Sequence, residues 1–233
     1  MTSAIAEKLI DSREAEPARS RDQGLVRYVG RHGVVTIAHV MKAMGVGRTA
    51  AYRRVAACIE AGLLERLEVL RSEPNLLRAT PEGLRYAGLP FPVAVISPGA
   101  VDHWLRCAST ALTVEKRLGS ECVLSERELV FAELAEERPI ASAEVGALPN
   151  GKPRLHRPDL AILTEKGVMA VEVELTPKSP RRLEGLIMAW TYATWVGRVQ
   201  YLCEPGQTRR AVERAVANVG ANRRVGIDEV VAR

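Results

Sequence analysis

The chain has 233 residues, of which 47% are hydrophobic and 26% charged, and its formal net charge is +5. This length is enough to bury a core without disulfide or metal staples, which excludes a disulfide mini-protein and a disordered tail. Every apolar stretch is shorter than the roughly 18 residues that a membrane span needs, and residues 1–22 lack the apolar run of a secretory signal, so we expect a cytoplasmic protein with no membrane partner.

The cysteines are Cys58, Cys107, Cys122 and Cys203. No two of them form a C-x-x-C pair, so the sequence shows neither a zinc pattern nor a redox motif, and we expect all four to be small buried hydrophobic residues. Charge is distributed unevenly, because residues 1–90 carry a net +4 and residues 91–233 a net +1. The basic excess of the first segment is compatible with a polyanionic partner.

We expect two domains of mixed α+β or α/β class. Residues 1–20 are polar and aperiodic, which predicts a flexible tail. Residues 21–90 predict a compact helical domain that ends in two strands. The uncharged segment 91–100 contains two prolines and a glycine, which is typical of a linker, and residues 101–233 form the second domain.

Three helices are expected at the start of the first domain. Asp22 can cap the first, which ends at Gly33, and Thr36 can cap the second, which ends at the glycine turn 45–47. The third helix covers residues 48–61. Its inward-facing residues are expected to be Tyr52, Val55, Ala56 and Ile59.

A strand, a tight turn and a second strand are expected to follow these helices. The string LLERLEVL predicts the first strand, the turn covers residues 72–75, and LLRAT predicts the second strand. Thr80-Pro81-Glu82-Gly83 is then typical of a helix start. Two helices joined by a short glycine turn and followed by such a hairpin make a helix-turn-helix with a wing.

The strings MGVGRTAAYRRVAACIEAGLLER and RATPEGLRYAG resemble the winged helix-turn-helix family over roughly residues 20–90. The resemblance implies that the third helix enters the major groove of duplex DNA, where arginine can pair with guanine and threonine or tyrosine can reach bases or phosphates. Tyr52 is therefore counted among the DNA contacts as well as among the packing residues. The candidate contacts are Arg48, Thr49, Tyr52, Arg53 and Arg54 on the helix, and Arg71 and Arg78 on the wing. The alternative is a winged helix used for protein contacts or dimerisation.

The second domain is expected to begin with a helix over 101–118, a short strand at 122–124, an acidic stretch 126–137 and a loop 149–153. Two strands joined by a turn at 165–167 are expected next, followed by a long helix over 181–195, a strand and a final helix. The long helix carries Trp190, Tyr192 and Trp195. We expect these three aromatic residues to pack in the core rather than to stack on bases.

Acidic residues mark the two strands around the turn. Asp159 opens the first strand, and side chains alternate along the second, so that Glu172 and Glu174 share a face. Three anionic groups that converge in a partly buried site repel one another unless they are neutralised, and Mg²⁺ is a suitable hard cation. His156 and Arg157 directly precede the acid and are placed to contact a phosphate. On spacing alone, an exposed face of an antiparallel strand explains the acids equally well.

Pro158-Asp159 followed by Glu172-Val173-Glu174 resembles the PD-(D/E)xK nuclease superfamily, in which these motifs hold Mg²⁺ and a nucleophilic water. The resemblance implies hydrolysis of a phosphodiester. Glu174 stands where lysine is usual, and Lys178, four residues on, can supply the cation. The implied catalytic residues are Asp159, Glu172, Glu174 and Lys178, of which the three acids bind the metal. Many members use a further upstream acid, for which Glu115 and Glu126 are the candidates.

A wider resemblance spans nearly the whole chain. The strings DHWLRCASTALTVEKRL, SERELVFAEL, HRPDLAIL and VEVELTPKSPRRLEGLIMAWTYA resemble the replication-relaxation family of actinobacterial plasmids and integrative elements. That family joins a winged helix to a nuclease-like domain. The resemblance implies a role in the replication, mobilisation or regulation of a mobile element.

The leading hypothesis is a protein whose winged helix docks on double-stranded DNA and whose second domain nicks or cleaves it with Mg²⁺. The alternative is a transcription or replication regulator that uses the nuclease-like fold as a dimerisation or DNA-clamping scaffold. A third interpretation is that the acid cluster is a protein-binding surface. Candidate partners besides DNA are a second copy of the chain and a relaxase or replication protein.

Overall fold

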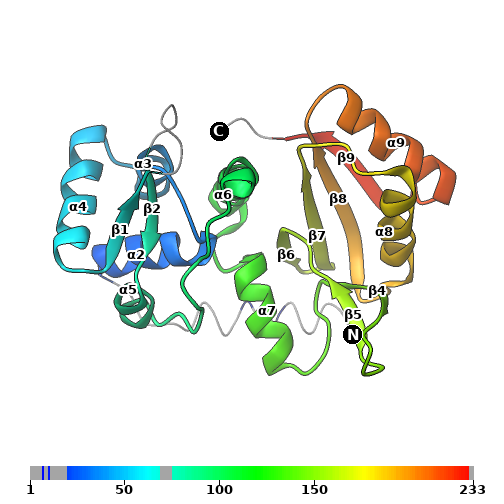
Figure 1. Cartoon of the computed structure of the whole chain (residues 1–233), viewed down its shortest axis with the longest axis horizontal. Coiled ribbons are helices and arrows are strands. Elements are labelled where there is room, and N and C mark those ends of the chain that lie inside the picture. The colour runs from blue at the N-terminus through cyan, green and yellow to red at the C-terminus, as the bar shows by residue number, and fades with distance from the viewer. Residues whose placement is uncertain (1–6, 8–9, 11–19, 69–74, 231–233) are drawn as a thin grey trace. The chain divides into compact units, whose positions relative to one another are not determined.

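The computed structural model describes Glu7, Ile10, residues 20–68 and residues 75–230. The described residues divide into two compact units (Figure 1). The first covers residues 20–113, apart from 69–74, and the second covers residues 114–230 together with Glu7 and Ile10. Both units combine helices with a β-sheet, which confirms the expected mixed class of α and β structure. None of the described helices combines the length and the apolar character that crossing a bilayer requires.

The first unit has a core of helices and one two-stranded sheet. Its elements are α2 (Arg21–His32), α3 (Ile37–Met44), α4 (Arg48–Glu60), β1 (Leu64–Leu67), β2 (Leu76–Ala79), α5 (Pro81–Tyr86), the 3-10 helix η1 (Pro98–Ala100) and the first part of α6 (Val101–Leu118). Strands β1 and β2 are antiparallel, with Leu64 opposite Ala79. Val35 adds a single bridge to Leu77 of β2. The residues that join β1 to β2 lie outside the described part.

Caps and glycines set the limits of these helices. Ser20, not Asp22 as expected, caps α2, because its side chain accepts a hydrogen bond from the N–H of Gln23. Thr36 caps α3, as expected, in a capping box whose third helical residue is His39. Gly45 ends α3 in the left-handed conformation with φ 62°, which glycine adopts without a steric penalty.

The inward face of α4 differs from the expected one. Its buried residues are Ala51, Val55 and Cys58, which follow one another at helical spacing. Tyr52 is 39% exposed and Ala56 is exposed, so the expected inward face is wrong at these two positions, while Ile59 is half-buried. Small residues thus pack against the core, and the large aromatic ring points outward.

The first unit continues past segment 91–100, the expected linker, into α6. Val101 and Leu105 belong to the same buried cluster as Leu76 of β2. The boundary between the two units falls after Thr113, within α6. The first turns of this helix supply apolar side chains that complete the core of the first unit, which explains why the compact unit is longer than the helix-turn-helix pattern.

The second unit is built on a five-stranded sheet with strand order β3-β6-β7-β8-β9. Its elements are the end of α6, β3 (Val123–Ser125), α7 (Glu126–Ala135), β4 (Ala143–Ala147), β5 (Pro153–His156), β6 (Leu160–Thr164), β7 (Gly167–Glu174), α8 (Pro180–Tyr192), β8 (Val196–Cys203), α9 (Gln207–Val219) and β9 (Val225–Glu229). Strands β3, β6 and β7 are antiparallel neighbours, whereas β7, β8 and β9 run parallel. The separate β4–β5 pair and β9 are absent from the expected order of elements.

Helices α8 and α9 lie side by side on one face of the sheet (Figure 1). Trp190 of α8 and Val212 of α9 share a buried cluster with Tyr201 of β8. Trp190 is therefore a core residue, as expected, but Tyr192 is 72% exposed, so its expected place in the core is wrong. Each of the two helices connects parallel strands, so each begins at the carboxyl edge of this part of the sheet.

Candidate functional site

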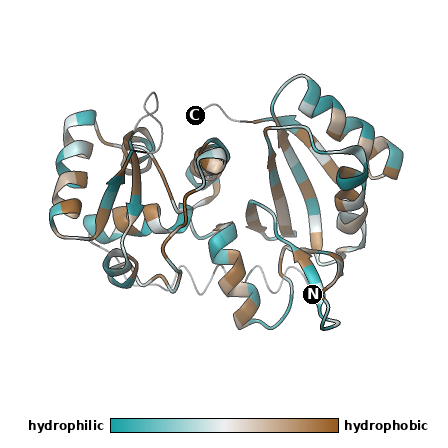
Figure 2. Ribbon diagram, in the orientation of Figure 1, coloured by the Kyte–Doolittle hydropathy of each residue, from teal (hydrophilic) through white to brown (hydrophobic). Residues whose placement is uncertain are grey.

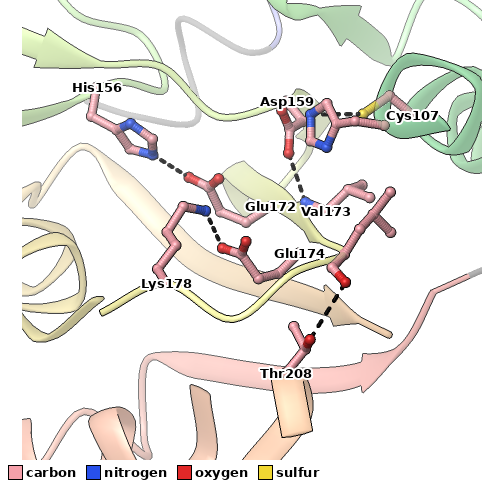
Figure 3. A network of polar contacts seen from close by, with 10 residues as sticks. Cys107, His156, Asp159, Glu172, Val173, Glu174, Lys178 and Thr208 are labelled. Carbon is pink, nitrogen blue, oxygen red and sulfur yellow. Dashed lines mark hydrogen bonds and ion pairs between the residues drawn. The ribbon is translucent and has the colours of Figure 1, made fainter. Parts of the chain in front are cut away.

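The acids of the second unit lie at the carboxyl end of β7. Glu172 and Glu174 are only 5% and 4% exposed, which excludes the alternative of an exposed strand face. Leu160 pairs with Val171, so Asp159, just before β6, lies beside this end of β7. Its Oδ2 accepts a hydrogen bond of 2.7 Å from the N–H of Val173 (Figure 3).

Each buried glutamate has a cationic or basic partner. His156 Nε2 lies 2.7 Å from Glu172 Oε1, and the Lys178 ammonium donates to Glu174 Oε2 (Figure 3). In both pairs the carboxylate is buried and the nitrogen-bearing side chain is about a quarter exposed. The two basic groups therefore separate the acids from solvent.

In the His156–Glu172 pair, burial of each group and its contact with the other shift its pKa in opposite directions. Burial raises the pKa of Glu172, the contact with His156 lowers it, and the nearby charge of Asp159 raises it again. Burial alone would lower the pKa of His156, but the hydrogen bond and charge of Glu172 offset this effect and leave the pKa raised. Lys178 acts on both groups electrostatically and lowers both pKa values. These four side chains therefore form one electrostatic unit.

Tyr201 is a member of this site that the sequence analysis did not single out. It lies directly opposite Glu172 in the parallel pairing of β7 and β8, and it is 1% exposed. Burial and the charges of Glu172 and Glu174 raise the pKa of its hydroxyl well above the ordinary value, so the phenol stays protonated. Tyr201 is therefore a neutral group beside the two glutamates, and the register of β7 and β8 explains its position.

Glu133 of α7 is a second residue that the sequence analysis missed. Its Oε1 accepts hydrogen bonds of 2.9 to 3.2 Å from the backbone N–H groups of Ile140, Ala141 and Ser142. Its Oε2 accepts from the Ser142 hydroxyl at 2.7 Å and lies 3.3 Å from Arg157 Nε. A buried carboxylate with this many donors holds the 140–142 turn and the side chain of Arg157, two residues before Asp159.

The donor chemistry of Asp159 and Glu172 fits a hard divalent cation. Both supply carboxylate oxygens, and the charge of Asp159 raises the pKa of Glu172, a repulsion that a cation between them would offset. Glu174 is held by Lys178 instead. In the described part of the chain, the three carboxylates do not form a group whose ligand oxygens all lie within 4.8 Å of one another. Asp159 and Glu172 are therefore the better pair of metal ligands.

The two candidate upstream acids lie in different places. The N–H of Glu126, at the start of α7, donates a hydrogen bond of 3.1 Å to the backbone oxygen of Asp159, while its side chain is exposed. Glu115 lies on α6, in the part that belongs to the second unit. Glu126 is thus the candidate that the backbone brings next to Asp159.

The first unit carries a separate polar surface on α4. The side chains on its outward face are Arg48, Thr49, Tyr52 and Arg53, all of them exposed. The Arg48 guanidinium lies over the Tyr52 ring, 5.6 Å from its centroid. This stacking orients the arginine without using its hydrogen-bond donors.

The other candidate DNA contacts are engaged within the protein or lie outside the described residues. Arg54 NH1 lies 2.6 Å from Asp22 Oδ1. Arg78 bonds to Glu65 at 2.9 Å and to the backbone oxygen of Ala94 at 2.8 Å. Arg71 lies outside the described residues. Arg48 and Arg53 are therefore the arginines of this set with the most available donors.

Comparison with models of known protein families gives no match for this chain, and no curated protein matches it. The indications of function come from its own residues, namely the outward face of α4 and the paired acids at the end of β7.

Proposed function

We propose that the protein binds double-stranded DNA through α4 of a winged helix-turn-helix, and that its second unit is a nuclease-like domain that nicks or cleaves DNA with Mg²⁺. The observation that carries the proposal is the outward face of α4. Arg48 and Arg53 project from it with no acidic partner in the described part of the chain, and Thr49 and Tyr52 lie between them. A helix with this composition can donate to base edges and phosphates in a major groove.

The arrangement around α4 supports the winged-helix part of the proposal. The glycine turn at 45–47 joins α3 to α4, and the antiparallel pair β1–β2 follows directly. The bridge from Val35 to Leu77 ties the segment before α3 to this pair. In such a module the first helices and the sheet support the recognition helix, and the hairpin forms the wing.

The second unit supports the nuclease-like part through its topology and its acids. The hairpin of β6 and β7 is followed by α8, which crosses over to the parallel strand β8. Asp159 and Glu172 would hold the metal, which when bound supplies an activated water and offsets charge on the phosphate. Lys178, whose ammonium is near both glutamates, would bind a phosphate oxygen, and His156 would orient Glu172.

A second candidate function is that of a non-catalytic regulator of transcription or replication. It is favoured by one specific observation: both buried glutamates already have basic partners, so the site is neutralised without a metal. In this case the nuclease-like unit would act as a scaffold for dimerisation, for clamping DNA, or for binding a relaxase or replication protein. Either function suits a mobile element such as a plasmid, which is the setting that the resemblance to the replication-relaxation family implies.

The DNA-binding part is tested by fluorescence anisotropy with the double variant Arg48→Gln plus Arg53→Gln. Each lost arginine contact to a base is worth about 1 to 3 kcal/mol, so affinity for a duplex should fall about 30-fold or more. The matched control is Lys116→Gln plus Arg117→Gln, which removes the same charge from exposed positions on α6. Equal affinity of the α4 variant and the wild type would refute binding through α4.

A further inference from the structure

The outer surface of α8 and α9 is basic and largely without ion pairs. The residues that define it, called the arginine face below, are Arg181, Arg182, Arg210 and Arg214, all exposed. None of the four is bonded to an acid in the described chain. The two helices carry two acids. Glu213 is paired with Arg209 at 2.8 Å, whereas Glu184 accepts from the neutral amide of Asn218 at 2.7 Å and keeps its charge. Four arginines against the one remaining charge of Glu184 leave this surface net positive.

The two helices present this charge as one layer. They share a buried cluster, and the Asn218–Glu184 hydrogen bond links α9 to α8. Figure 1 shows them on the same face of the sheet, and Figure 2 shows α9 mostly in hydrophilic colours. Arg210 and Arg214 are four residues apart, about 6 Å along the helix axis, and so lie on one side of α9.

The arginine face extends to the edge of the sheet that holds the acids. The N–H of Glu204 donates to the backbone oxygen of Glu174 at 2.9 Å, and Thr208, in the first turn of α9, lies 3.4 Å from the backbone oxygen of Leu175. Both helices thus begin beside the end of β7. Arg181 and Arg182 are in the first turn of α8, and Arg210 is in the first turn of α9.

We propose that the arginine face binds the phosphate backbone of duplex DNA and is a second DNA contact, separate from α4. Guanidinium groups bind phosphate oxygens bidentately, and contacts to phosphate position a protein without reading sequence. The spacing of Arg210 and Arg214 is close to twice the axial rise of about 3.4 Å between successive phosphates of one strand. Charge complementarity and continuity with the acid-bearing edge favour a polyphosphate chain over a compact anion. The inference rests on the proposed function, because it takes DNA as the ligand.

The test is the salt dependence of DNA binding by the full chain. Anisotropy with a duplex of about 30 base pairs is measured between about 50 and 200 mM salt for the wild type and for Arg210→Gln plus Arg214→Gln. Loss of two phosphate contacts lowers the slope of log K against log salt by about 1.8. The loss should be equal on two duplexes of unrelated sequence. Lys116→Gln plus Arg117→Gln is the matched control and should keep the wild-type slope.

The outcomes separate this inference from the proposed function. An unchanged slope in the α9 variant, together with weakened binding by Arg48→Gln plus Arg53→Gln, overturns the inference and leaves DNA binding through α4 in place. An equal loss of slope in the control also overturns it, because charge anywhere would then suffice. If the α4 variant binds normally and the α9 variant does not, the inference stands and the role of α4 fails. A wild-type chain that binds no duplex at about 50 mM salt overturns both.

Discussion

Lys178 forms an ion pair with Glu174, four residues before it in the sequence, so the ammonium reaches the acids from the segment between β7 and α8. In the (D/E)-x-K pattern on which the proposed nuclease function draws, a lysine would stand on the strand at the position that Glu174 occupies in this chain. The cation and the extra carboxylate neutralise each other. A divalent ion bound beside the end of β7 would therefore compete with the Lys178 ammonium for the negative charge of Glu172 and Glu174.

Removal of that competitor should strengthen metal binding. In Lys178→Met, the ammonium charge near Glu172 and Glu174 is lost, and the affinity for Mn²⁺ should rise about tenfold, which corresponds to about 1.4 kcal/mol. Isothermal titration calorimetry or electron paramagnetic resonance measures this directly. Lys166→Met, at an exposed turn, is the control and should leave the affinity unchanged. Weaker binding in Lys178→Met would show that the lysine does not compete with the ion.

Glu133 should be essential for the stability of the second unit. Glu133→Ala leaves three backbone N–H groups, the Ser142 hydroxyl and Arg157 without their acceptor in a buried place, which should lower the free energy of unfolding by about 3 kcal/mol or more. Urea denaturation followed by circular dichroism measures the change. Glu144→Ala removes a carboxylate from an exposed position and should change the value by less than about 0.5 kcal/mol. Similar values for the two variants would contradict the role of Glu133.

His39 of α3 should anchor the first part of α6 within the first unit. Its Nδ1 accepts from the N–H of Thr36 at 3.3 Å, so its hydrogen is on Nε2, which donates to the backbone oxygen of Leu105 at 3.1 Å and lies 3.0 Å from Ser109 Oγ. His39→Ala should lower the free energy of unfolding by about 2 to 4 kcal/mol. Ser109→Ala, which removes one of these partners, should cost about 1 kcal/mol. A His39→Ala variant as stable as the wild type would refute this linkage.

Two cysteines should resist alkylation in the folded protein. Burial, together with the charge of Glu174, raises the pKa of Cys203 to about 12, and burial with the charge of Asp22 raises that of Cys58 to about 11. At pH 8, iodoacetamide should modify Cys58 about 100-fold and Cys203 about 1000-fold more slowly than in urea, as peptide mass spectrometry can show. Since the unfolded thiols lose their protons first, the free energy of unfolding should fall as the pH rises above about 9. Equal rates in the folded and unfolded chain would contradict this account.

Local signals explain which parts of the fold could be predicted. The capping role of Thr36 and the end of α3 at Gly45 follow from short-range chemistry, and the structure confirms them. The β4–β5 hairpin could not be read in the same way, because AEVGA contains small residues and shows no clear alternation, and its partner β5 has only four residues and begins with Pro153. The expected inward face of α4 is wrong for a related reason: Ala51 and Cys58 are small, and the larger Tyr52 carries the stronger apolar signal.

The candidate site shows the same limit. The alternation along β7 predicts that Glu172 and Glu174 share a face. Lys178 is only four residues after Glu174, so the sequence also indicates that its side chain can reach these acids. Tyr201 joins them only through the parallel register of β7 and β8, which local periodicity does not report. The signal in the sequence is a polar-tipped tyrosine within the apolar strand that is expected after the long helix.

The most direct test of the central proposal is incubation of supercoiled plasmid with the purified protein in Mg²⁺ or Mn²⁺, beside the double variant Asp159→Ala plus Glu172→Ala. A gel shift on the same samples reports binding independently of cleavage. The proposal predicts relaxed or linear DNA with the wild type, intact supercoiled DNA with the variant, and a shift with both. Intact DNA with both proteins, together with a shift in both, would contradict nuclease activity and favour the regulator.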